Sequence, residues 1–112
     1  MAQQSQDDAC RQLCQDILDH PRGDYRISVL AARMNMTERT FIRRFSRELH
    51  ISPAKFVEKV RLDAARCALE ETTLNLDQIA HDTGFQSLEV LRRTFQRHMA
   101  ISPKEYRARF GG

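Results

Sequence analysis

The longest regular pattern of apolar residues in the chain predicts one helix over residues 52–71. Its apolar positions recur at helical spacing on more than one side: Phe56, Val60, Leu62, Ala64, Ala65 and Leu69. Ser52 is a favourable N-cap, and Pro53 suits the first helical position because its missing N–H has no partner there anyway. No Gly or Pro follows before Thr72. At ~1.5 Å per residue, the 18 residues 53–70 span roughly 27 Å.

Shorter helical patterns precede this long helix. After a polar tail at residues 1–6, Asp7 or Asp8 is expected to open a first helix that runs to about His20. The expected apolar stripe of that helix is Ala9, Leu13, Ile17 and Leu18. The residues Pro21–Asp24 form a turn signal.

A short helix, a tight turn and a capped longer helix are predicted next. The short helix covers about residues 28–33, with Ser28 as its cap. Its inward residues are Val29, Leu30 and either Ala31 or Ala32. The turn at 34–36 contains Asn35, which tolerates a left-handed backbone. Thr37 caps the longer helix, which runs to about Leu49. Phe41, Phe45 and Leu49 face inward at a spacing of four.

The same series of elements recurs after the long helix. Leu76, Ile79 and Ala80 indicate a short helix over about 77–83, which Gly84 ends. Ser87 caps a helix to about Met99, whose inward residues are expected to be Leu91, Phe95 and Met99. A last short helix begins at Ser102–Pro103 and contains Tyr106 and Phe110. Since no stretch alternates with period 2 for long, we expect an all-α protein of seven helices.

An ungapped internal repeat relates the two halves. Residues 41–53 match 91–103 at six of 13 positions, each pair 50 residues apart. The identical pairs are Arg43/Arg93, Phe45/Phe95, Arg47/Arg97, Ile51/Ile101, Ser52/Ser102 and Pro53/Pro103. We therefore expect a tail and first helix at 1–24, a unit at 25–51, a linker helix at 52–71 and a second unit at 72–112.

Each unit has the order of a helix-turn-helix, in which a second helix enters the major groove of DNA. The small Ala31 and Ala80 fall where the paired helices cross. On the second helix, one row holds Arg39, Arg43 and Arg47, and the matching row holds Glu89, Arg93 and Arg97. Arginine can bind guanine through two hydrogen bonds or can bind phosphates. One such row on one helix would more often be a solvated surface, but two rows in register favour DNA binding.

Three further kinds of position belong to these second helices. The N-termini that Thr37 and Ser87 cap have N–H groups suited to a phosphate oxygen. Leu88 and Ile42 could each touch a thymine methyl group or pack inside, and the sequence does not decide between the two. His50, His81 and His98 are expected on the surface.

Charge supports a polyanionic partner. Residues 1–24 hold five Asp against Arg11 and Arg22, a net charge of −3. Residues 25–112 hold 16 Lys and Arg against 10 Asp and Glu, a net charge of +6. The basic excess therefore lies in the duplicated part of the chain.

The two rows also suggest how DNA would be read. Two helices can read one face of B-DNA if they enter major grooves ~34 Å apart. The long helix could join both reading units in one chain, and the DNA could need to bend if the helices lie closer than one turn. The set Arg39, Ile42 and Arg43 differs from the matching set Glu89, Arg92 and Arg93 at its first two positions, so the expected site is asymmetric.

Other function classes find little support. No catalytic constellation, phosphate loop or secretory signal is present, so neither an enzyme nor a cofactor is expected. No apolar run approaches 18 residues, so no membrane span is expected. Cys10 and Cys14 lie one helical turn apart but lack further ligands, so small buried thiols in a reducing cytosol are expected with Cys67. The main alternative to DNA binding is a helical adaptor whose arginines bind an acidic protein.

From about Ile27 to Phe110 the chain resembles the DNA-binding domain of the AraC/XylS family of bacterial transcription regulators. The resemblance rests on LAARMNMTERTFIRRF, ISPAKFVEKVRLDAARCAL, IAHDTGFQS and LRRTFQRHMAISPKEYRARF. It implies seven helices and binding of double-stranded promoter DNA beside RNA polymerase, in the bacterial cytoplasm at the nucleoid. The base-reading positions that it implies are Glu38, Arg39, Ile42 and Arg43, and Leu88, Glu89, Arg92 and Arg93.

The chain departs from this family in two ways. The family usually has Gly before its I-S-P turn, where His50 and Ala100 stand, so either the helices end without a left-handed residue or a strained one is tolerated. Members are also about three times longer, so an excised domain or a short stand-alone member is expected, with any effector bound by a missing N-terminal domain. The LRRTF segment resembles members whose N-terminal domain is DJ-1/PfpI-like.

Overall fold

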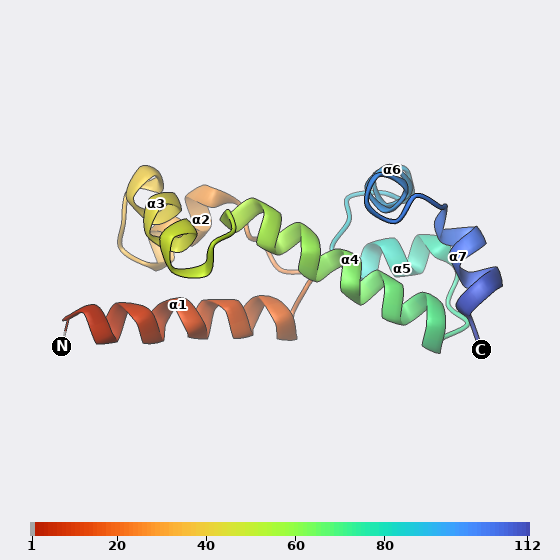
Figure 1. Ribbon diagram of the computed structural model, residues 1–112, viewed down its shortest axis with the longest axis horizontal. Helices are drawn as coiled ribbons and strands as arrows, with labels where there is room; N and C mark the ends of the chain where they lie inside the picture. The colour runs from red at the N-terminus through yellow and green to blue at the C-terminus, as the bar shows by residue number, and fades with distance from the viewer. Residues whose placement is uncertain (1) are drawn as a thin grey trace. The chain divides into compact units, whose positions relative to one another are not determined.

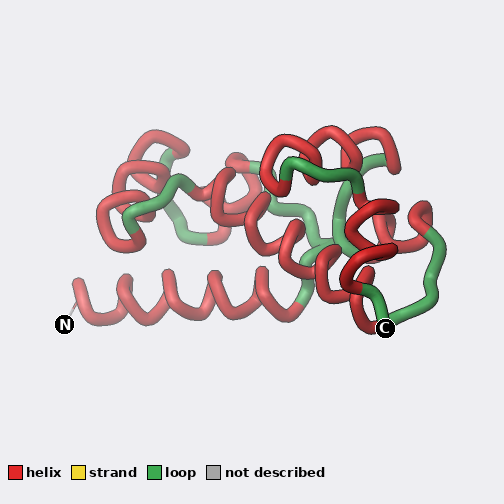
Figure 2. Tube along the Cα trace, turned by 45° about the vertical axis from the view of Figure 1, so that its right-hand side comes forward, coloured by secondary structure: helices red, strands yellow, loops and turns green. Residues whose placement is uncertain are grey.

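The computed structural model describes residues 2–112, with side chains from residue 8 onward. Seven α-helices and no strand occur in this part of the chain (Figures 1 and 2), which confirms the all-α prediction. Their bounds are α1 Ala2–Asp19, α2 Ile27–Arg33, α3 Glu38–Leu49, α4 Pro53–Glu71, α5 Leu76–Asp82, α6 Leu88–Met99 and α7 Pro103–Phe110. None of the described helices combines the length and apolar character needed to cross a bilayer.

The chain divides into two compact units within α4. Unit 1 ends at Glu58, and unit 2 comprises Lys59–Gly112. α4 is the predicted long helix, and it begins where expected because the Ser52 hydroxyl accepts a hydrogen bond from the Lys55 N–H (3.2 Å). One uninterrupted helix thus belongs to both units, each of which contains a helix-turn-helix.

In unit 1, α2 packs against α3 (Figure 1), and the turn that joins the two helices contains one left-handed residue. That residue is Asn35, with φ 57°, and the Met36 N–H beyond it donates to the Ala31 carbonyl (2.9 Å). Ala31, 2% exposed, is the inward alanine, whereas Ala32 is exposed. The buried core of unit 1 is Cys10, Leu13, Ile17, Leu30, Ala31, Phe41, Phe45 and Val57.

α1 differs from its prediction at both its start and its apolar stripe. It begins at Ala2 rather than at Asp7 or Asp8, so the expected tail is helical from residue 2. Leu13 and Ile17 are buried as predicted, but Ala9 and Leu18 are exposed. Cys10 is buried in their place, since residues 10, 13 and 17 recur at helical spacing on a single face.

The start of α2 was also predicted wrongly. Arg26 occupies the N-cap without a side-chain hydrogen bond, and Ser28 lies inside the first turn. Tertiary bonds position this segment instead. The Tyr25 hydroxyl donates to the His20 carbonyl (2.6 Å), and the Arg33 guanidinium pairs with Asp16 of α1.

In unit 2, the second half of α4 packs with α5, α6 and α7 around one core. Its buried residues are Leu62, Ala65, Leu69, Ile79, Ala80, Leu91, Phe95 and Tyr106. Asn75 caps α5, and Gly84 follows that helix with φ 92°, a conformation that favours glycine. Met99 of α6, which was expected inward, is exposed (36%) because it is the last residue of its helix, and Phe110 at the end of α7 is exposed as well (57%).

The sequence repeat is also a repeat of local structure. His50 and Ala100 both adopt left-handed backbone, with φ 58° and 64°, so a strained residue is tolerated where the family has glycine. Pro53 and Pro103 are both buried at the starts of α4 and α7. The edge-on ring contact of Phe45 with Phe56 (5.7 Å between centroids) recurs in Phe95 with Tyr106 (5.4 Å).

The two turns differ in length by one residue. Ala31 and Asn35 correspond to Ala80 and Gly84, which lie 49 residues later, whereas the caps Thr37 and Ser87 are 50 apart. In both turns the N–H of the residue after the left-handed position donates to the alanine carbonyl at 2.9 Å. The extra residue of the second turn therefore falls between that bond and the cap.

Candidate nucleic-acid interface

The second helix of each helix-turn-helix starts at a side-chain cap. The Thr37 hydroxyl accepts a hydrogen bond from the Thr40 N–H at 3.2 Å, and the Ser87 hydroxyl accepts one from the Val90 N–H at 3.2 Å. Both caps were predicted, and both are exposed. The Thr37 hydroxyl also donates to the Thr40 hydroxyl at 3.0 Å, whereas the Ser87 O–H remains available to donate outward.

α3 has a sharply divided surface. Phe41 and Phe45 are each only 1% exposed and face the core of unit 1. By contrast, the predicted DNA-contacting positions of α3 are all exposed: Glu38, Arg39, Ile42, Arg43 and Arg47. Ile42 is 38% exposed, which answers the question that the sequence left open, since this side chain does not pack inside.

α6 is divided in the same way, with one difference. Leu91 and Phe95 are fully buried, and the predicted positions Glu89, Arg92, Arg93 and Arg97 are exposed. Leu88 is half-buried and packs against the core cluster of unit 2. Leu88 therefore packs against the core, whereas Ile42 of α3 does not.

Both helices are basic. α3 holds four arginines against two glutamates, and α6 holds three against one, so each has a net charge of +2 from these residues. The one acidic residue in the first turn of each, Glu38 or Glu89, lies at the positive end of the helix dipole. Arg39 lies in the first turn of α3, and the other arginines of the two helices follow in later turns.

A hollow on α3 contains two residues that sequence reasoning missed. Its volume is about 230 Å³, and Thr40, Arg43, Arg44 and Arg47 line it. Thr40 and Arg44 were not among the predicted site residues. The spacing of 40, 44 and 47, at four and three residues, places them on one side of a helix and could have revealed them.

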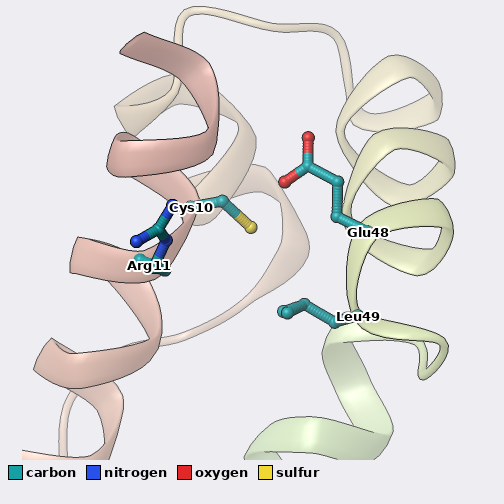
Figure 3. A pocket seen from close by; sticks show the side chains of 4 residues that line it. All are labelled: Cys10, Arg11, Glu48 and Leu49. Carbon is teal, nitrogen blue, oxygen red and sulfur yellow. The ribbon is translucent and has the colours of Figure 1, made fainter. Parts of the chain in front are cut away.

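A second hollow lies between α1 and α3 within unit 1 (Figure 3). Cys10 and Arg11 of α1 and Glu48 and Leu49 of α3 line its volume of about 270 Å³, and the Cys10 side chain points toward α3. Burial, together with the nearby Cys14 and Glu48, raises the pKa of the Cys10 thiol to about 12. This thiol stays protonated at neutral pH.

The other candidate ligands are dispersed. The three cysteines are free, and they differ in exposure: Cys10 is buried, Cys14 half-buried and Cys67 exposed. The expectation of buried thiols is therefore wrong for Cys67. Across the described side chains no cluster of three metal-ligating residues occurs. The predicted surface histidines His50, His81 and His98 are all exposed.

Comparison with known proteins agrees with this geometry. A family model described as a helix-turn-helix domain matches residues 30–109. The HTH-type transcriptional regulator Rv1931c of Mycobacterium tuberculosis is 44% identical over 88 residues, which are 79% of this chain and 34% of that protein. The chain spans about a third of the length of the curated relatives it matches.

Two solved structures show the same fold. The DNA-binding domain of AdpA, a global transcriptional factor crystallised with a target DNA, superposes with a TM-score of 0.86 and 32% identity. The match covers 90% of this chain and 91% of that one. An AraC-type regulator from Chromobacterium violaceum superposes with a TM-score of 0.76 and 25% identity, over 96% of this chain and 94% of that one.

Proposed function

This chain belongs to the AraC-type helix-turn-helix family, and on that premise we propose that it binds double-stranded promoter DNA sequence-specifically and regulates transcription. The observation that carries the proposal is the exposed arginine row on the capped second helix of each unit. Arg43 and Arg93 lie at matching positions of the two rows. The match to a domain solved with its target DNA supports the same conclusion.

In the proposed complex, α3 and α6 enter successive major-groove segments of one site. Arg43 and Arg93 donate paired hydrogen bonds to guanine, and Arg39 and Arg92 contact neighbouring bases or phosphates. The methyl groups of Ile42 lie against a thymine methyl. Since α6 has Arg92 where α3 has Ile42, the two half-sites differ, and the site is not a palindrome.

Backbone contacts fix the position of each helix. Ser87 donates its hydroxyl proton to a phosphate oxygen, and the first helical N–H groups that follow Thr37 and Ser87 donate to phosphates as well. Arg47 and Arg97, one turn beyond the reading arginines, bind phosphates farther along the groove. Glu38 and Glu89 accept a hydrogen bond from a cytosine amino group.

The rest of the regulator supplies the signal. The chain spans about a third of its relatives, and we propose that a preceding domain, of the DJ-1/PfpI-like type, binds the effector. The DNA-bound domain then acts beside RNA polymerase, in the cytoplasm at the bacterial nucleoid. No enzymatic step is proposed, because the relatives are transcriptional regulators.

The proposal is tested with duplexes selected from a random pool by the purified chain. Affinity for a selected duplex is expected to fall linearly with the logarithm of salt concentration, with a slope of roughly −0.9 for each phosphate contact. Arg43→Ala and Arg93→Ala are each expected to weaken binding by about 1–3 kcal/mol. The control is Arg22→Ala, at an exposed position in the turn before α2, which leaves affinity unchanged.

Equal affinity for selected and unrelated duplexes would contradict sequence-specific binding. Wild-type affinity in both Arg43→Ala and Arg93→Ala would contradict the roles given to these residues. Tighter binding to an acidic protein than to any duplex would favour the adaptor alternative.

A further inference from the structure

Arg44 stands out among the arginines of α3 because part of its guanidinium is buried without a partner. Among the buried side-chain nitrogen and oxygen atoms of the described residues, the Arg44 Nε is the one that has no hydrogen-bond partner. A buried N–H that lacks an acceptor is destabilising by about 1–3 kcal/mol. Arg44 also lines, with Thr40, Arg43 and Arg47, a hollow of about 230 Å³ on the surface of α3.

The charges around this hollow are of one sign. Three guanidinium groups line it, and within the described part of the chain no carboxylate pairs with any of them. Like charges four residues apart on a helix, such as Arg43 and Arg47, destabilise it by about 0.2–0.5 kcal/mol. An anion in the hollow would remove this repulsion and accept several charged hydrogen bonds at once.

Thr40 adds a neutral donor to the same hollow. Its hydroxyl oxygen accepts a hydrogen bond from the Thr37 hydroxyl at 3.0 Å. The hydroxyl proton of Thr40 is therefore free to be donated elsewhere. With Arg43 reserved for a base, the guanidinium groups of Arg44 and Arg47 and the Thr40 hydroxyl make a donor set suited to a tetrahedral oxyanion, and the volume exceeds the ~30 Å³ that one water molecule occupies.

The second unit lacks this donor set. At the positions 50 residues later, Val90 replaces Thr40 and Thr94 replaces Arg44. Thr94 is 6% exposed and lies in the core side of α6 rather than on its surface. The hollow is therefore a property of α3 and not a general feature of the repeated helix.

We propose that Thr40, Arg44 and Arg47 form a binding site for one phosphate group, which in the DNA complex is a single backbone phosphodiester beside the guanine that Arg43 reads. This inference rests on the proposed function and adds to it Thr40 and Arg44 as residues that fix the position of α3 on the DNA. Unit 1 then anchors the chain to the backbone more firmly than unit 2 does.

The test replaces Arg44 by the residue of the second unit. Arg44→Thr is expected to weaken binding to a selected duplex about tenfold and to reduce the magnitude of the salt slope by roughly 0.9, the value for one phosphate. Arg44→Lys is expected to keep the slope, because the cation remains. Arg22→Thr, a loss of one exposed positive charge outside the hollow, is the matched control and is expected to change neither quantity.

A second arm locates the phosphate. Each linkage of the duplex is replaced in turn by an uncharged methylphosphonate. At one linkage, the replacement is expected to weaken wild-type binding about tenfold and to leave Arg44→Thr binding unchanged. A third arm titrates the DNA-free chain with inorganic phosphate and follows the Arg44 Nε–H resonance. Inorganic phosphate at up to a few millimolar is expected to leave this resonance unchanged, whereas duplex DNA is expected to shift it.

The outcomes separate this inference from the proposed function. If wild-type protein binds its duplex but Arg44→Thr keeps the wild-type slope and affinity, the phosphate site is refuted and the proposed function stands. A shift by inorganic phosphate with no sensitive linkage would assign the site to a free anion and overturn the DNA contact. If wild-type protein shows no salt-dependent, sequence-specific binding, both proposals fall together.

Discussion

At the level of single residues, the ends of α3 and α6 hold backbone strain. His50 and Ala100 adopt φ 58° and 64°, and each donates its N–H to a carbonyl one turn back, Ser46 at 2.8 Å and Gln96 at 2.9 Å. For an L residue this region is unfavourable by roughly 1–2 kcal/mol. The following Ile-Ser-Pro segment keeps the chain in this turn, since Pro53 and Pro103 are buried at the start of the next helix.

Replacing the strained alanine by glycine should therefore stabilise the protein. Ala100→Gly is expected to raise the free energy of unfolding by about 1 kcal/mol, because glycine adopts the left-handed region without strain. The measurement is urea denaturation followed by circular dichroism. Ala9→Gly, an exposed alanine within α1, is the control and should lower the same free energy by about 0.5–1 kcal/mol. Destabilisation by both substitutions would show that Ala100 is not strained.

The three thiols should differ in reactivity. Burial raises the pKa of Cys10 to about 12 and raises the pKa of Cys14, whereas Cys67 is exposed. Since the thiolate is the nucleophile, iodoacetamide at pH 8 is expected to alkylate Cys67 at least tenfold faster than Cys10. Mass spectrometry of peptides from the native protein measures both rates. Equal rates in the native protein would contradict the burial of Cys10, and the denatured protein serves as the control.

At the level of elements, local side-chain chemistry sets where most helices begin. Thr37, Ser52, Asn75, Ser87 and Ser102 each accept a hydrogen bond from the N–H three residues later. The two helices that depart from prediction, α1 and α2, are those whose expected caps were not used. A cap residue is typically worth about 1 kcal/mol of stability.

Two of these caps allow stability to be separated from DNA binding. Ser87→Ala and Ser102→Ala are each expected to lower the free energy of unfolding by about 1 kcal/mol through loss of the cap. Only Ser87→Ala is also expected to weaken binding to a selected duplex, severalfold, because Ser102 begins α7 outside the proposed interface. Denaturation and fluorescence-anisotropy titration measure the two effects. A severalfold loss of affinity in Ser102→Ala would show that the binding defect follows stability alone.

The sequence was sufficient for features that depend on neighbouring residues along the chain. It predicted the long helix, the cap at Ser87, the left-handed turn at Asn35 and the exposed arginine rows, because each follows from helical spacing or local hydrogen bonding. It failed for Met99, Ala9 and Leu18, whose exposure depends on where a helix ends or which face meets another helix. Leu88 could not be decided in advance, because its packing depends on a core assembled from distant segments.

The candidate site, like the fold, could be predicted from the sequence only in part. The exposure of the arginine rows on α3 and α6 could be predicted, since the buried apolar residues at a spacing of four fix the inward face. The hollow on α3 could not, because it depends on the conformations of four side chains and on the orphaned Nε of Arg44. In the second unit Val90 and Thr94 replace Thr40 and Arg44, and this difference can be interpreted only once the hollow is known.

At the level of the whole molecule, the chain carries two different reading helices joined through one continuous helix. α4 has 19 residues, or roughly 28 Å at 1.5 Å per residue, and each unit includes part of it. Most helix-turn-helix proteins obtain two reading helices by dimerising, which produces a palindromic site. A single chain with two unlike helices does not require a palindromic site. Its proposed target sequence can therefore be asymmetric and can have a defined direction relative to a promoter.

The most direct test is a footprint of the purified chain on one selected duplex, repeated with Arg43→Ala and Arg93→Ala. Two protected major-groove segments are expected on one face, their centres separated by about one helical turn of 10–10.5 base pairs. Arg43→Ala should lose protection at one segment and Arg93→Ala at the other. A single protected segment, or loss of the same segment in both variants, would contradict the claim that the two helices read adjacent parts of one site.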